Sequence, residues 1–160
     1  MQVELTNPYN TNFCDFHKAE QIARNYDAVI SLGHKLKDEF LNPKSKYLFL
    51  DFQDFDPSVV EQDHKLASLI ATQSQIQELV DFCKELKPND KLLIHCLAGI
   101  GRSSAGAIVA MCVRESMNLY AAKGLVKTRR IPRDDDNIRP NFYVINHYMN
   151  IKYPVKGDDK

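Results

Sequence analysis

Residues 92–113 constrain the fold more than any other stretch of this 160-residue chain. The apolar run Leu92–His95 has the length and composition of a buried β-strand, and it leads directly into the loop Cys96–Arg102. The next stretch, Ser103–Val113, is apolar almost all round, which indicates a helix buried under a sheet rather than lying on a surface. A strand, a tight loop and a buried helix in this order are typical of the α/β class.

The rest of the chain alternates short apolar runs with stretches of helical period. Further strands are predicted at Val3–Leu5, Asp27–Leu32 and Tyr47–Phe52. Helical stripes are predicted through Phe16, Ala19, Ile22 and Ala23, and through Leu66, Leu69, Ile70, Ile76, Leu79, Val80 and Cys83. Asn118 is predicted to cap a short helix with Leu119, Ala122, Leu125 and Val126 inside, and Pro140 to open a last one carrying Phe142, Ile145 and Met149. We therefore expect a single, mostly parallel central sheet flanked by helices on both faces, with the loop Cys96–Arg102 between a central strand and a buried helix.

Composition predicts one domain over residues 1–155, followed by a polar tail at 156–160. Lysine plus arginine equals aspartate plus glutamate at 21 each, so no global field attracts the chain to nucleic acid or to an anionic membrane. Neither a membrane span nor a secretory leader is visible, and we expect a cytoplasmic monomer. The four cysteines form no CxxC pair or zinc spacing, so neither disulfides nor a metal or other cofactor is expected.

The loop Cys96–Arg102 has the composition of a phosphate-binding loop. Several backbone N–H groups can converge on one point at the start of the following helix, whose dipole adds partial positive charge. Gly99 and Gly101 allow the close backbone approach that such a loop needs, and Arg102 can fold back to donate two hydrogen bonds to phosphate oxygens. The residues expected to bind the phosphate are Leu97, Ala98, Gly99, Ile100, Gly101 and Arg102.

Cys96 is predicted to be a nucleophile, because the groups that bind phosphate also stabilise a thiolate. His95 precedes it at the strand end, where an imidazole can hydrogen-bond the loop backbone and fix its shape. Ser103 follows Arg102 and can donate to the sulfur when the thiolate has to leave.

The segment His95-Cys96-Leu97-Ala98-Gly99-Ile100-Gly101-Arg102-Ser103 resembles the signature of the protein tyrosine phosphatase superfamily: His-Cys, five residues, then Arg followed by Ser or Thr. The chain's length, its lack of tryptophan and the absence of a long insertion make it similar to the compact dual-specificity-like branch, and to small bacterial and phage tyrosine phosphatases. Arg139-Pro140-Asn141 is similar to the Pro-Asn that opens the last helix of dual-specificity members. The resemblance implies a phosphatase that hydrolyses phosphotyrosine in proteins through a cysteinyl-phosphate intermediate, with phosphoserine and phosphothreonine as further candidate targets.

Hydrolysis of an aryl phosphate also needs a carboxyl group that protonates the leaving oxygen and then activates water. In the family this aspartate lies upstream, on a loop after a strand. Asp51 still belongs to the predicted strand, and Asp63 is better placed as an N-cap. Asp54, just past the strand end as in the small bacterial relatives, is the favoured general acid and base. Asp56 is the alternative candidate for this role. Its structural interpretation is a turn residue before Pro57.

Other polar residues are given structural interpretations. The basic residues Lys127, Arg129, Arg130 and Arg133 are interpreted as a solvated loop beside Asp134–Asp136, with contact to acidic groups of a substrate as the alternative. The remaining histidines, expected to be surface or structural, are His17, His34, His64 and His147. The remaining thiols, expected in the core or on the surface, are Cys14, Cys83 and Cys112.

Three candidate functions are consistent with these residues. A phosphotyrosine or dual-specificity protein phosphatase leads, with a phosphorylated protein or peptide as the partner. The uncharged Leu97, Ala98 and Ile100 argue against a phosphoinositide phosphatase, since such enzymes tend to carry lysines in the loop. An RNA 5′-triphosphatase is the second enzyme candidate, and the neutral net charge argues against nucleic acid. A phosphoprotein-binding module without turnover is the third.

Overall fold

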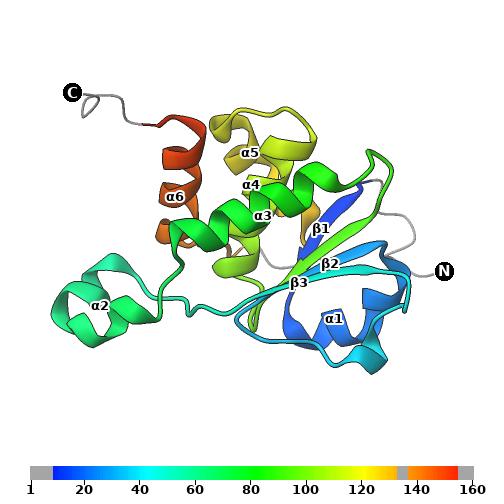
Figure 1. The fold of residues 1–160 in the computed structure, drawn as a ribbon, viewed down its shortest axis with the longest axis horizontal. Coiled ribbons are helices and arrows are strands. Elements are labelled where there is room, and N and C mark those ends of the chain that lie inside the picture. Colours follow the sequence, from blue (N-terminus) through cyan, green and yellow to red (C-terminus); the bar gives the residue numbers. More distant parts are fainter. Residues whose placement is uncertain (1–8, 133–136, 155–160) are drawn as a thin grey trace.

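A four-stranded parallel sheet lies at the centre of the computed structural model, which describes residues 9–132 and 137–154. The strands are β1 (Thr11–Cys14), β2 (Ala28–Leu32), β3 (Lys46–Leu50) and β4 (Leu92–His95). They are arranged in the order β1-β4-β2-β3, and every neighbouring pair is parallel (Figure 1). The predicted strand Leu92–His95 is therefore central, with a neighbour on each side.

Helices cover both faces of this sheet. The α-helices are α1 (Phe16–Ile22), α2 (Pro57–Gln62), α3 (Gln73–Glu85), α4 (Arg102–Arg114), α5 (Leu119–Leu125) and α6 (Phe142–Lys152). The 3₁₀ helices are η2 (Ala23–Asn25), η3 (Asp38–Phe40), η4 (His64–Ser68) and η5 (Val126–Arg129). Figure 1 shows α3 to α6 on one side of the sheet and α1 on the other, and a separate apolar cluster fills each side. The predicted α/β class and two-sided covering are confirmed.

Helix α4 packs directly onto the sheet, and this contact sets the position of the loop before it. Residues 102–112 are all buried, as expected for a helix that is apolar almost all round. A Cβ at Gly106 would lie only 3.0 Å from Cδ1 of Leu32 and 3.2 Å from Cγ2 of Ile94, so the glycine allows the helix to pack closely on β2 and β4. With β4 central and α4 against it, the loop between them lies at the carboxyl edge of the sheet, where parallel sheets bind ligands.

The first strand of the sheet is not the predicted one. Val3–Leu5 lies outside the described residues, as does the predicted tail 156–160. The structure has β1 at Thr11–Cys14, a strand that the sequence analysis missed. It begins with two buried polar residues, so it lacks an apolar run. Asn12 accepts a hydrogen bond from Tyr26 Oη and donates one to the Arg129 carbonyl. These two hydrogen bonds offset the free-energy cost of burying its side chain.

The long helical stripe predicted from Leu66 to Cys83 is wrong in its first half. Thr72 and Gln75 form a reciprocal capping box, so α3 begins only at Gln73. The preceding residues form η4, which Asp63 caps by accepting from the Lys65 N–H, and Leu69 is 44% exposed. Helix α2 was not predicted either, and in Figure 1 it projects away from the sheet.

The last two helices are present, but parts of their predicted inner faces are wrong. Asn118 caps α5 as predicted, whereas Leu125 is 45% exposed. Asn141 rather than Pro140 opens α6, because its side chain accepts from two helical N–H groups. Among the residues of α6, Val144 and Tyr148 are the buried ones, while Phe142 is 52% exposed and Met149 only half-buried. No helix in the described part of the chain is long and apolar enough to cross a membrane.

Candidate active site

Cys96 lies at the carboxyl end of the central strand, and its side chain is 2% exposed. Its Sγ atom lies 3.1 Å from Oγ of Ser103 and accepts a hydrogen bond of 3.3 Å from the Gly99 N–H. Gly99 has a φ of +71°, which favours glycine at this turn. The structure therefore brings the predicted nucleophile, the predicted hydroxyl donor and the loop backbone together.

The carbonyl groups of the Cys96 loop (residues 96–102) are held by donors outside it. The donors are His95 Nδ1 to the Cys96 carbonyl at 3.2 Å, the Phe16 N–H to Leu97 at 3.0 Å, Arg130 Nη2 to Ala98 at 3.4 Å, Arg130 Nε to Gly99 at 3.2 Å, the Arg139 N–H to Ile100 at 3.0 Å and the Asn141 N–H to Gly101 at 3.0 Å. In a planar trans peptide the C=O and the next N–H point in opposite directions. Carbonyls held from outside therefore turn the following amides toward the interior of the loop. Of the amides of residues 97–101, only that of Gly99 has an acceptor within the described part of the chain.

Arg102 follows these amides in the chain and is buried. Its guanidinium group contacts Phe52 and Gly33, which lie on two other loops. Its Nη1 donates to the Phe52 carbonyl at 2.9 Å. A Cβ at Gly33 would lie 1.9 Å from the same Nη1, so the glycine leaves the space that the guanidinium occupies. Its Nε is buried and has no acceptor among the described residues. A buried cationic N–H without an acceptor, beside inward-facing amides, fits an oxyanion such as phosphate.

Asp54 lies against the loop, whereas Asp56 bonds within its own turn. Asp54 Oδ1 accepts a 2.8 Å hydrogen bond from Nδ2 of Asn141. A Cβ at Gly101 would lie 2.0 Å from Asp54 Oδ2, so the carboxylate packs directly on the loop backbone. Asp56 stands just before α2 and accepts from the hydroxyl of Ser58. Both are exposed, and both line one open pocket of about 610 Å³, the mouth pocket. The described residues that line it are Asp54, Phe55, Asp56, Ala98, Ile100, Arg139, Pro140, Asn141 and Phe142.

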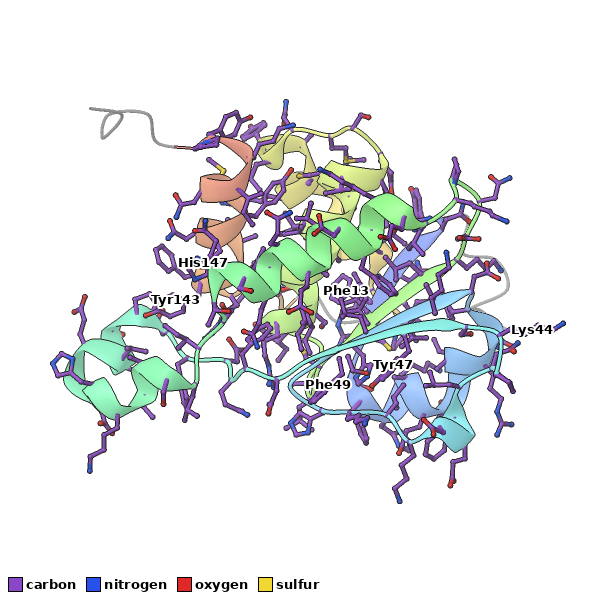
Figure 2. All side chains as sticks on the ribbon, in the orientation of Figure 1. Phe13, Lys44, Tyr47, Phe49, Tyr143 and His147 are labelled. Atoms are coloured by element: carbon purple, nitrogen blue, oxygen red, sulfur yellow. The ribbon has the colours of Figure 1, made fainter. Side chains whose placement is uncertain are left out.

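A chain of hydrogen bonds fixes the tautomer of His95. The Leu36 N–H donates to Tyr47 Oη, which donates to Ser31 Oγ at 2.7 Å, and Ser31 in turn contacts Nε2 of His95. Because Nε2 accepts a hydrogen bond, the ring proton is on Nδ1, and Nδ1 donates a hydrogen bond to the Cys96 carbonyl. Figure 2 shows Tyr47 below β3, on the side of α1. Burial lowers the pKa of His95 to about 4, which keeps the ring neutral. Sequence reasoning missed Tyr47 and Ser31, although a serine inside a buried strand was a usable signal.

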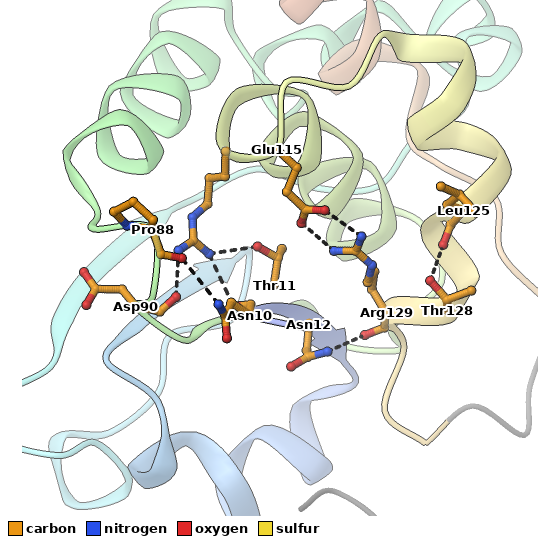
Figure 3. Close-up of polar contacts among 10 residues, drawn as sticks. Asn10, Thr11, Asn12, Pro88, Asp90, Glu115, Leu125, Thr128 and Arg129 are labelled. Carbon is orange, nitrogen blue, oxygen red and sulfur yellow. Dashed lines mark hydrogen bonds and ion pairs between the residues drawn. The ribbon is translucent and has the colours of Figure 1, made fainter. Parts of the chain in front are cut away.

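The interpretation of Arg129 and Arg130 as part of a solvated loop is wrong, because both are buried at 2% and 5% exposure. Arg129 makes two hydrogen bonds of 2.6 and 2.7 Å to the Glu115 carboxylate, at the far end of α4 from Cys96 (Figure 3). Arg130 instead holds two carbonyls of the Cys96 loop. Lys127 is exposed as expected, and Arg133 with Asp134–Asp136 lies outside the described residues.

Comparisons with known proteins find likeness over part of the sequence and in the fold. No protein-family model matches the chain. "Dual specificity protein phosphatase 16" of Homo sapiens is 34% identical over 83 residues, which are 51% of this chain but only 12% of that protein. Among solved structures, Tk-PTP in its active form has a TM-score of 0.63 at 16% identity, over 91% of this chain and 92% of that one. A human tyrosine phosphatase-like serine/threonine/tyrosine-interacting protein has a TM-score of 0.53 at 20% identity, over 86% of this chain and 82% of that one. The chain therefore shares the fold of these structures.

Arg130→Met should weaken the binding of inorganic phosphate, because the Ala98 and Gly99 carbonyls lose their donors and the adjoining amides lose their orientation. We expect a roughly tenfold higher dissociation constant by calorimetry, about the effect of one lost hydrogen bond to an anion. Arg129→Met is the matched control: it removes a buried arginine next in sequence that contacts Glu115 rather than the loop. Equal losses of phosphate affinity in the two variants would contradict the role of Arg130 in orienting the Cys96 loop.

The neutral state of His95 predicts a pH dependence of stability. The pKa of His95 is lowered from 6.5 to about 4 in the folded chain, so below pH 6.5 the unfolded chain binds a proton that the folded one does not. The free energy of unfolding should therefore fall as pH decreases from 6.5 to about 4, with this histidine contributing up to about 1.4 kcal/mol per pH unit.

Denaturant unfolding of His95→Asn across this pH range should show a flatter dependence, while the exposed His64→Asn should retain that of the parent chain. Nuclear magnetic resonance of the His95 ring in the unaltered protein checks the same point without a substitution. A ring that titrates near pH 6.5 would refute the account.

Proposed function

Because this chain shares the fold of the protein tyrosine phosphatase superfamily and resembles its dual-specificity branch in sequence, we propose that it is a cysteine-dependent phosphatase acting on phosphotyrosine in proteins. Phosphoserine and phosphothreonine are further candidate substrates. The observation that carries the proposal is the Cys96 loop, whose carbonyls are held from outside while the Gly99 N–H donates to the Cys96 sulfur. That arrangement suits a phosphate dianion held against a nucleophile.

In the first step, Sγ of Cys96 forms a bond to phosphorus as the bond from phosphorus to the leaving oxygen breaks. The loop amides and Arg102 hold the three non-bridging oxygens, on which charge is spread during transfer. Asp54 gives its proton to the leaving oxygen, which takes the electron pair of the broken bond. The contact of Asp54 with the Gly101 backbone supports this role, since it holds the carboxyl above the loop.

In the second step, water attacks the cysteinyl-phosphate and transfers a proton to the same Asp54 carboxylate. The bond between sulfur and phosphorus breaks, and the sulfur leaves as a thiolate. Ser103 Oγ, 3.1 Å from Sγ, is placed to donate a hydrogen bond to that developing charge. Inorganic phosphate then leaves through the mouth pocket.

A binding module without turnover is the alternative from another class of function. The nucleophile, the arginine and a carboxylate in contact with the loop are all present here, and this combination supports turnover over binding alone. Orientation of Asp54 by Asn141 supports the same choice, because simple phosphate binding would gain nothing from an acid held there.

Asp54→Asn should slow phenyl phosphate hydrolysis by roughly 10²- to 10⁴-fold, the usual contribution of a general acid. The loss in kcat/KM should be much smaller with an aryl phosphate whose leaving group is itself acidic, because that oxygen needs no proton and kcat/KM does not report the later breakdown of the intermediate. Asp56→Asn is the matched variant from the same pocket, and we expect a minor effect on both substrates.

Steady-state kinetics of the two substrates checks this prediction, with Cys96→Ser as the inactive reference. Equal losses on both substrates in Asp54→Asn would rule out a proton-donor role. A leaving-group-dependent loss in Asp56→Asn instead would transfer the role to Asp56.

A further inference from the structure

A second pocket, of about 480 Å³, lies between the end of α5, η5 and the start of α6. Its inner wall is apolar and is formed by Val126, Ile138 and Ile145, while the exposed Lys123 and Lys127 stand at its rim. The described residues that line it include no acidic side chain. We call it the lysine-rimmed pocket. An apolar wall with cations at the edge suits an apolar side chain next to a carboxylate.

The lysine-rimmed pocket adjoins the mouth pocket, since Pro140 and Phe142 line both. Phe142 is half-exposed at this junction, at 52%. Two touching spheres of about 480 and 610 Å³ would have centres about 10 Å apart, a distance spanned by about three residues of extended chain. A peptide whose phosphorylated residue occupies the mouth pocket, which Ala98 and Ile100 of the Cys96 loop help to line, can therefore place a residue about three positions away beside the lysines.

Charge differs along this path. In the mouth pocket the charge of Asp56 is balanced by the exposed Arg139, and Asp54 carries its proton when a substrate binds, so acidic groups beside the phosphorylated residue gain no net attraction there. The far end contains Lys123 and Lys127, which attract them. An acidic residue of a substrate is thus favoured at a distance from the phosphate rather than next to it, with an apolar residue between the two.

Resting on the proposed function, we propose that the lysine-rimmed pocket is a substrate subsite that selects phosphoproteins with an apolar residue and, about three positions from the phosphorylated residue, an acidic one. The apolar wall favours a peptide over RNA, because additional RNA phosphates would gain nothing from Val126, Ile138 and Ile145. Lys123 and Lys127 determine specificity and take no part in the chemistry.

The test uses phosphotyrosine peptides that all carry leucine two positions from the phosphotyrosine. The third position, on either side in separate sets, is glutamate or lysine, and each kcat/KM is divided by that for phenyl phosphate. The parent protein should prefer glutamate by roughly 5- to 10-fold in one of the sets, as two exposed ion pairs allow. Lys123→Glu/Lys127→Glu should invert this preference.

Lys84→Glu/Lys152→Glu is the matched control, because it makes the same charge change at two exposed lysines of another pocket, between α3, α4 and α6. It should retain the glutamate preference. Peptides hydrolysed without a preference, or an inversion equal in both double variants, would overturn the subsite and leave the proposed function standing.

Hydrolysis of phenyl phosphate but of no phosphopeptide would overturn the proposed protein substrates, and the subsite with them. Hydrolysis of 5′-triphosphorylated RNA alone, dependent on Lys123 and Lys127, would assign the lysines to RNA and overturn both proposals.

Discussion

The planarity of the peptide bond is the constraint on which this site depends. The six carbonyls of residues 96–101 in the Cys96 loop are held from outside, and each fixed carbonyl turns the next amide inward. A loop free in solution would gain nothing from six N–H groups directed at one point, because they would repel each other's partial charges. The surrounding fold therefore has to impose this geometry, and the loop sequence alone is insufficient to do so.

Several elements that are distant in sequence supply the donors. Phe16 stands at the start of α1, Arg130 follows η5, and Arg139 and Asn141 precede α6. His95 ends the central strand and takes its own orientation from Ser31 on β2 and Tyr47 on β3. Because the donors come from both faces of the sheet, a local rearrangement of any of these elements would affect the same few amides. The sheet order, with β4 in the middle, makes this convergence possible.

Much of the fold and of the candidate site was predictable from local sequence patterns. The rest depends on contacts between residues far apart in the chain, which the sequence does not display. The strand Leu92–His95 matches its predicted bounds, since a buried apolar run has few other uses. Asp54 was singled out because it follows a recognisable strand, and the structure has it in contact with the Cys96 loop. Strand β1 was missed because Asn12 is buried as a hydrogen-bonding residue. Arg130 was interpreted as solvated because its partners, the Ala98 and Gly99 carbonyls, are backbone atoms and leave no trace in the composition.

The central claim is that Cys96, within its loop, accepts the phosphoryl group. In Asp54→Asn, an aryl phosphate with an acidic leaving group should still transfer its phosphoryl group, while breakdown of the intermediate slows for want of a base. Rapid quenching followed by peptide mass spectrometry should then find one phosphoryl group on Cys96, accumulated to nearly one per protein. A phosphoryl group on another residue, or phosphate released with no covalent intermediate at any time, would contradict the account.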